Sequence, residues 1–251
     1  MTQDFLDTLQ LHDKATLLGT VTAIYDAGCL LGAIVAMFWA ERWGRKPSVF
    51  YGTTIMAVGA LLQTTAYSVP HMIVGRIIAG IGNGINTSIA PIWQGETSQV
   101  KWRGKLVIVE TTLNIAGFSL SNWITFAFSF IPGPVAWRFP LAFQFAFILI
   151  LYATVPWLPE SPRWLVAHEC PDEAVVIIAD LEDKSTDDPY VVTEFTEIAA
   201  SVEYERQNAV SWKNLFQGNV GGNGSTCAIR RMFLGAGAQF MQQAAGINVT
   251  R

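Results

Sequence analysis

Residues 18–47 read LGTVTAIYDAGCLLGAIVAMFWAERWGRKP. Its first part, residues 18–40, is an apolar run whose sole charged residue is Asp26, and the turn that follows is rich in charge. An α-helix needs roughly 20 apolar residues to cross about 30 Å of hydrocarbon. The stretch therefore predicts a membrane-spanning helix that ends in a charged turn.

Further apolar runs of similar length predict an all-α membrane protein. The composition agrees, because 51% of the residues are hydrophobic, 14% are charged and the mean hydropathy is +0.33. Helices are favoured over strands because the runs lack alternation of apolar and polar residues. The first run is no signal peptide, since no basic flank precedes it and a charged loop follows it. The six predicted spans are residues 18–40, 49–67, 72–93, 106–130, 139–158 and 232–250.

Basic residues mark the loops on one side of the membrane. Lys and Arg gather after the first span, after the third and before the sixth, whereas the loops AYSVPH (66–71) and SFIPGPVAW (129–137) contain neither. Short basic loops are typical of the cytoplasmic side. Residues 1–17 are therefore expected to be an extracellular loop remnant, and a helix that precedes them is expected to be missing.

Residues 166–229 differ from the spans because they are charged. LEDKSTDDPY (181–190) predicts a loop, and YVVTEFTEIAASVEYERQNAV (190–210) predicts an amphipathic helix. A cytoplasmic helical linker is the expected structure. The chain then divides into the loop remnant 1–17, a transmembrane bundle 18–165, the linker 166–229 and a final helical segment 230–251.

No pattern typical of an enzyme occurs in the sequence. No nucleophile with a base is evident, and GIGNGINT (80–87) lacks the Lys-Ser/Thr ending of a phosphate-binding loop. Cys29, Cys170 and Cys227 have the spacing of neither a disulfide framework nor a metal site. The sequence predicts no enzyme, no metal site, no cofactor and no nucleic-acid partner.

Opposite charges gather at three predicted cytoplasmic helix ends. Such a set suggests a network that forms and breaks between two conformations, as a gate does. The acids of the second and third ends, Glu96 and Glu160, should lie within about one Debye length, roughly 8 Å, of an arginine. The members of this predicted gate network are Glu41, Arg42, Arg45, Glu96, Arg103, Glu160 and Arg163.

Five motifs carry a resemblance to a known family. ERWGRKP, RIIAGIGNGINTSIAPIWQGETSQVKWRG, WRFPLAFQ, PESPRWL and QQAAGIN occur in this order and spacing. They resemble the sugar porter family of the major facilitator superfamily, and the fungal hexose and disaccharide transporters in particular. The resemblance implies twelve helices in two halves, a charged linker between the halves and a sugar site at their interface.

The same resemblance implies that this chain is a fragment with a partial major facilitator fold. The six predicted spans correspond to the second through the seventh helix of the family. Residues 230–251 then form the truncated first helix of the C-terminal half.

The resemblance also assigns residues to sugar binding. The family's QQxxGxN pattern falls on Gln242, Gln243 and Asn248, and a carboxamide suits sugar hydroxyls because it donates and accepts without carrying charge. Many relatives have a sugar-contacting Gln on the helix after RGK, where this chain has Thr111 with Glu110 beside it. Hydrogen bonding between helices is the alternative role for the amides.

Coupling to protons is left open by the residues. Ionisable groups inside a bilayer are costly and usually functional, which draws attention to Arg76. Relatives that move protons pair this arginine with an acid on their first helix, which this chain lacks. Proton symport and facilitated diffusion both stay open.

Two classes of function are therefore weighed. The first is transport of a neutral sugar, a hexose or a disaccharide, by alternating access across the plasma membrane in the full-length parent, with the fragment inactive alone. The alternative is a sugar sensor or structural membrane protein that binds without transporting.

Overall fold

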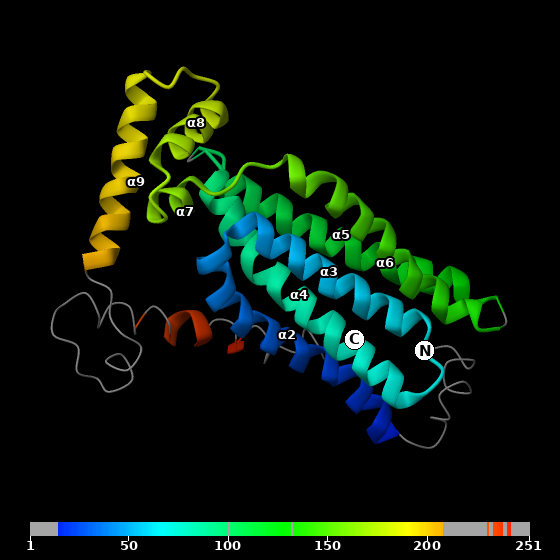
Figure 1. The fold of residues 1–251 in the computed structure, drawn as a ribbon. Coiled ribbons are helices and arrows are strands. Elements are labelled where there is room, and N and C mark those ends of the chain that lie inside the picture. Colours follow the sequence, from blue (N-terminus) through cyan, green and yellow to red (C-terminus); the bar gives the residue numbers. More distant parts are fainter. Residues whose placement is uncertain are drawn as a thin grey trace. The chain divides into compact units, whose positions relative to one another are not determined.

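The computed structural model describes residues 15–99, 101–131, 133–207, 230, 233–237 and 240–241. The chain divides into two compact units between Ala199 and Ala200. In the second unit, residues 233–237 are helical. The elements are α2 (Ala15–Trp43), α3 (Arg45–Thr64), α4 (Val69–Thr97), α5 (Arg103–Ser129), α6 (Val135–Thr154), the 3-10 turn η1 (Val155–Trp157), α7 (Pro162–Ala167), α8 (Pro171–Glu182) and α9 (Pro189–Gln207) (Figure 1).

The all-α prediction is confirmed, and the first five predicted spans coincide with the long helices α2 to α6. Several helices extend beyond the predicted runs, as α2 does at both ends, because backbone hydrogen bonding continues through polar residues that hydropathy excludes. The sixth predicted span, 232–250, falls mostly outside the described residues, of which 233–237 and 240–241 are helical.

Short polar and proline-containing stretches separate the helices. Ser68, with extended backbone angles φ −143° and ψ 155°, precedes α4, and Pro70 lies in its first turn. Proline is favoured there because the first N–H groups of a helix have no partner within it. Helix α4 can therefore begin at Val69, soon after α3 ends at Thr64.

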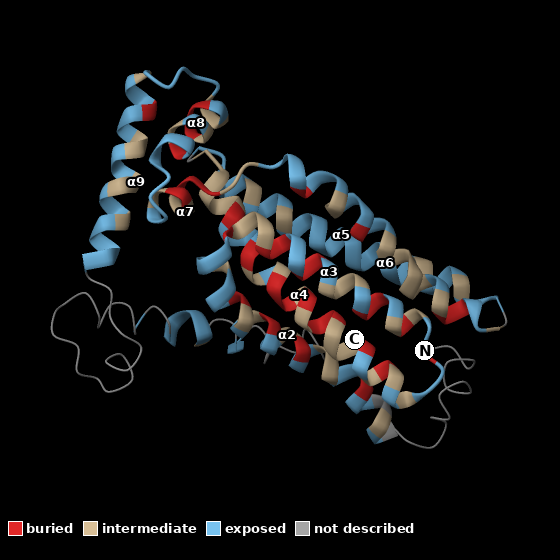
Figure 2. Cartoon of the chain, in the orientation of Figure 1, coloured by how far each residue is buried: buried red, intermediate tan, exposed pale blue. Residues whose placement is uncertain are grey.

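Helix α4 packs along both α2 and α3, and the three helices lie side by side (Figure 1). Buried residues gather along α4 (Figure 2). Glycines on the facing sides let α2 and α4 approach closely. A Cβ atom added to Gly28 would lie 2.7 Å from the carbonyl oxygen of Ile77. Gly80 and Gly84 of α4 meet the backbone of α2 in the same way.

The outer faces of the bundle are apolar and exposed. Phe38 on α2, Ile108 on α5 and Leu149 on α6 expose 60%, 68% and 67% of their surface. Such faces are typical of membrane contact. By length and composition, the stretches Gly19–Trp43 and Val135–Trp157 are apolar enough to cross a membrane among the described helices. Helices α3 and α4 carry more polar residues, among them Gln63 and Asn83.

The predicted linker begins with a small helical hairpin. Ile178 and Ala179 of α8 and Val191 of α9 form its buried cluster. The hairpin is connected to the bundle, because the Gln99 side-chain amide, just after α4, donates to the Leu181 carbonyl at 3.0 Å. Helix α9 agrees with the amphipathic helix predicted over residues 190–210 as far as the described residues reach, whereas α8 was not predicted as a separate helix.

Candidate functional site: the charged helix ends

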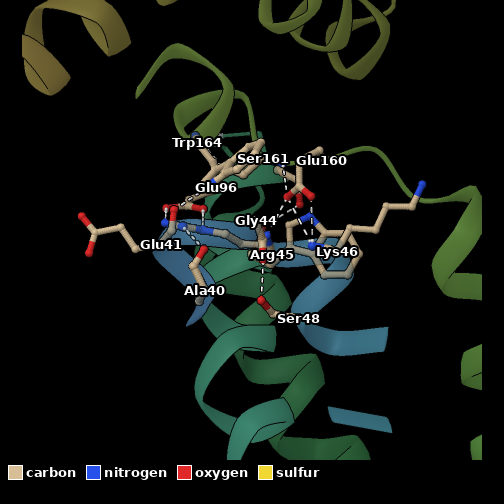
Figure 3. Close-up of polar contacts among 12 residues, drawn as sticks. Ala40, Glu41, Gly44, Arg45, Lys46, Ser48, Glu96, Glu160, Ser161 and Trp164 are labelled. Atoms are coloured by element: carbon tan, nitrogen blue, oxygen red, sulfur yellow. Dashed lines mark hydrogen bonds and ion pairs between the residues drawn. The ribbon is translucent and has the colours of Figure 1, made fainter. Parts of the chain in front are cut away.

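An ion pair joins the start of α3 to the end of α4 (Figure 3). The Arg45 guanidinium donates from Nε to Glu96 Oε2 at 2.9 Å and from Nη2 to Glu96 Oε1 at 3.0 Å. It also donates to the Ala40 carbonyl at 3.1 Å. The side chains of Arg45 and Glu96 are only 17% and 14% exposed, so water screens the pair incompletely. This two-pronged geometry is specific to arginine.

The Glu160 carboxylate lies at the N-terminus of α3 (Figure 3). It accepts from the backbone N–H of Arg45 at 2.9 Å and from that of Lys46 at 3.1 Å. It also accepts from its neighbour Ser161 N–H at 3.0 Å. The first N–H groups of a helix lack partners within the helix and attract negative charge. Glu160 therefore caps α3 from a segment that follows α6.

The turn before α3 is shaped to admit this carboxylate. Gly44 has φ 93°, a left-handed conformation that L side chains rarely adopt. A Cβ atom at Gly44 would lie 2.8 Å from Glu160 Oε2, so any larger residue would push the carboxylate away. Gly44 thus adopts the backbone angle that the turn requires and leaves room for the Glu160 carboxylate.

Other contacts fix the segment around Glu160. Lys46 Nζ donates to the Pro156 carbonyl at 2.8 Å, and Trp164 Nε1 donates to the Glu41 carbonyl at 2.9 Å. The buried Ser161 hydroxyl accepts from Trp164 N–H at 3.2 Å and so caps α7. Together with Glu160 these bonds connect α2, α3 and the segment before α7.

The structure brings three members of the predicted gate network together, Arg45, Glu96 and Glu160. Glu160 lies against backbone N–H groups of α3, a contact that the sequence hypothesis of charge pairing did not include. Glu41 and Arg42 are exposed at the end of α2, where Glu41 contributes its carbonyl.

The remaining members of the predicted network lie on other elements. Arg163 is half-buried on α7, and Arg103 is exposed at the start of α5. Burial raises the pKa of the Glu194 carboxyl on α9, and the charge of Glu182 raises it further, whereas Arg103 opposes both. Arg103 therefore interacts electrostatically with the linker hairpin.

Sequence reasoning missed Lys46, Ser161 and Trp164. The Ser161-Pro162 pair was a readable signal, because serine before a proline is typical of a helix start. No local pattern indicates the partners of Lys46 and Trp164, since they are carbonyls 110 and 123 residues away in the chain.

The predicted sugar-binding and proton-coupling residues have different surroundings. Glu110 is half-buried and Thr111 exposed on α5, and the Thr111 hydroxyl donates to the Val107 carbonyl at 2.9 Å.

Arg76 is half-buried on α4, and within the described chain its Nε has no hydrogen-bond partner. It interacts electrostatically with Asp26 of α2. Gln242, Gln243 and Asn248 lie outside the described residues.

The substitution Glu160→Gln tests the cap on α3. It keeps the size of the side chain but removes the charge and one acceptor oxygen. Because a charge at a helix N-terminus is worth typically 0.3–1 kcal/mol, and up to about 2 kcal/mol when partly buried, we expect a fall of about 1 kcal/mol in the free energy of unfolding. Thermal unfolding of the protein in detergent measures this loss of stability. Glu205→Gln, on the exposed end of α9, is the control, and an equal loss in both variants would contradict the cap.

Long apolar helices with a network of charged side chains at one end define a helical bundle suited to a membrane. The structure resembles that of the proton:xylose symporter XylE from E. coli, with a TM-score of 0.72 and 23% identity over 80% of this chain and 46% of that one. That likeness shows a partial major facilitator fold.

The chain belongs to the family described as "Sugar (and other) transporter", whose family model matches residues 3–250. It is therefore an integral membrane protein. It is 57% identical to the MFS-type transporter oryC of Aspergillus oryzae over 99% of this chain and 46% of the relative. It is 36% identical to the sugar transporter STL1 of Saccharomyces cerevisiae over 94% of this chain and 42% of that relative. The chain thus spans about half the length of the curated relatives it matches.

Proposed function

We propose that this chain forms part of a transporter that moves a neutral sugar across the plasma membrane by alternating access. The family and the named transporters support sugar transport as the general activity. The observation that carries the mechanism is the network of Arg45, Glu96 and Glu160, because it ties three helix ends together through contacts that can break.

The network is suited to act as a gate. Exposed ion pairs contribute only about 0–1 kcal/mol, but these side chains are mostly shielded from water. Separating them leaves a partly buried guanidinium and the first N–H groups of α3 without partners. The closed arrangement therefore resists opening until substrate binding favours the other conformation.

Substrate contacts are proposed for Gln242, Gln243 and Asn248, with Thr111 and Glu110 on α5 as further candidates. Carboxamides match hydroxyl groups without the desolvation penalty of a charge. Arg76 is the candidate for proton coupling. Alkalinisation of the medium during sugar uptake would indicate symport, and its absence would indicate facilitated diffusion.

Uptake of radiolabelled hexoses and disaccharides by transporter-deficient yeast tests the proposal. We expect uptake from a complete transporter that contains this chain, and none from the 251-residue chain alone. Gln242→Ala should raise the KM by about two- to twelvefold, because each lost hydrogen bond is worth about 0.5–1.5 kcal/mol.

Gln207→Ala is the control for Gln242→Ala, because Gln207 is exposed on α9 and bonds to Glu203. Absence of uptake for every sugar, at normal surface expression, would count against the proposed function. An unchanged KM in Gln242→Ala and Asn248→Ala would place the sugar elsewhere.

The alternative of a non-transporting sugar sensor is not favoured. Both named relatives reported above are transporters, and the mostly shielded ion pair is suited to a cycle of opening and closing. Sugar-dependent signalling without uptake would reverse this preference.

A further inference from the structure

Trp93 makes a polar contact at the charged helix ends that the gate described above does not use. Its ring is buried, 7% exposed, in a cluster of Ala36, Val49, Ile85, Ile89 and Val155. Its indole N–H leaves this cluster and donates to the Pro159 carbonyl at 3.1 Å. A phenylalanine could supply the packing, so the N–H needs a separate explanation.

The acceptor of this bond is adjacent to Glu160. The Pro159 carbonyl and the Glu160 nitrogen belong to one peptide unit, which is planar and rigid. Holding the carbonyl therefore orients the backbone from which the Glu160 side chain extends. That side chain reaches the N–H groups of Arg45 and Lys46 at 2.9 and 3.1 Å.

The same helix end also holds Arg45. Glu96 follows Trp93 by three residues, so both lie on one face of α4. Glu96 binds the Arg45 side chain, while Trp93 holds the segment whose carboxylate caps the Arg45 backbone. The end of α4 therefore contacts the start of α3 in two ways. Glu96 binds the Arg45 side chain directly, and Trp93 acts indirectly through residues 159–160.

We propose that Trp93 is a positioning residue for the gate, whose indole N–H places the Glu160 carboxylate over the N-terminus of α3. A shift of the end of α4 then releases the Arg45 side chain and the α3 cap in one movement. The positioning itself stands apart from the proposed function, and only its effect on transport rests on that function.

Hydrogen–deuterium exchange on the purified 251-residue chain in detergent tests the positioning. Trp93→Phe removes the donor and keeps an aromatic ring in the cluster. We expect faster exchange at the amides of Arg45, Lys46 and Ser161, by about two- to twelvefold, the range that one lost hydrogen bond covers. Trp157→Phe is the matched control, because Trp157 is 88% exposed and should leave these amides unchanged.

A combination with Glu160→Gln separates positioning from packing. If Trp93 acts through Glu160, Trp93→Phe should add little to the exchange already caused by Glu160→Gln. Unchanged exchange at Arg45 and Lys46 in Trp93→Phe would overturn the proposal. Fully additive effects, or faster exchange along the whole of α4, would show that Trp93 only packs and would overturn it as well.

The consequence for transport is measured in the complete transporter. Trp93→Phe should lower the maximal uptake rate and leave the KM near its original value, because Trp93 belongs to the charged helix ends and is not among the proposed sugar contacts. A raised KM with an unchanged maximal rate would contradict a gating effect. Absence of any sugar uptake by the unsubstituted protein would refute the proposed function and leave the exchange result standing.

Discussion

Replacing Glu96 by alanine should abolish most of the sugar uptake of the complete transporter and destabilise the charged helix ends. The substitution leaves the Arg45 guanidinium, 17% exposed, without its carboxylate. Removing one partner of a fully buried pair costs about 3–5 kcal/mol, and partial exposure here lowers our expectation to about 2 kcal/mol. That loss corresponds to more than a tenfold change in the population of the conformation in which the ion pair is formed.

Uptake at saturating sugar and thermal unfolding in detergent measure the two effects of Glu96→Ala. Arg45→Lys is the informative companion, because lysine keeps the charge but not the two-pronged geometry, and it should show an intermediate loss. In a double-mutant cycle, Arg45→Ala and Glu96→Ala together should cost less than the sum of the single substitutions. Additive losses, or normal uptake in Glu96→Ala, would show that the pair does not act as a unit.

Replacing Gly84 by alanine should separate α2 from α4 and so disrupt the centre of the bundle. A Cβ atom at Gly84 would overlap the carbonyl group of Cys29, and the obstacle is backbone, which cannot turn aside as a side chain can. Overpacking of this kind costs typically about 1–3 kcal/mol and occasionally more. The better helix propensity of alanine, about 0.5–1 kcal/mol, offsets only part of that cost.

The unfolding temperature and the folded yield of the 251-residue chain in detergent report the effect of Gly84→Ala. Gly117→Ala is the matched control, because it lies within α5 and an added Cβ would meet nothing within 4 Å. We expect it to be neutral or stabilising. Equal behaviour of the two variants would mean that the close approach of α2 and α4 does not limit stability.

The sequence predicted the helices well because the membrane imposes a simple rule. A run such as 18–40 must satisfy all its backbone groups internally in lipid, so length and hydropathy alone indicate a helix, and α2 confirms it. The helix that α2 packs against was not predicted, although Gly28 and Gly32 of α2 lie against its backbone. That partner is α4, whose own Gly80 and Gly84 match them.

At the charged helix ends, the sequence predicted the residues but not all of their partners. The motifs placed Arg45, Glu96 and Glu160 at such ends, and opposite charge suggested side-chain pairing. Only one of the two contacts is of that kind, since Glu160 instead accepts from the backbone of α3. A free backbone N–H exists at every helix start, so composition does not reveal which distant carboxylate will reach it.

The amino-acid sequence is sufficient to predict the helical class, the approximate positions of the first five membrane helices and the charged character of their ends. These properties depend on local composition, through the hydrocarbon thickness and the backbone's need for hydrogen bonds. The folded structure was needed to show that Glu160 caps α3, that Lys46 donates to the Pro156 carbonyl and that Trp93 donates to the Pro159 carbonyl. Those contacts join residues 66 to 115 positions apart, and they form because small residues let the helices pack closely enough to bring the ends together.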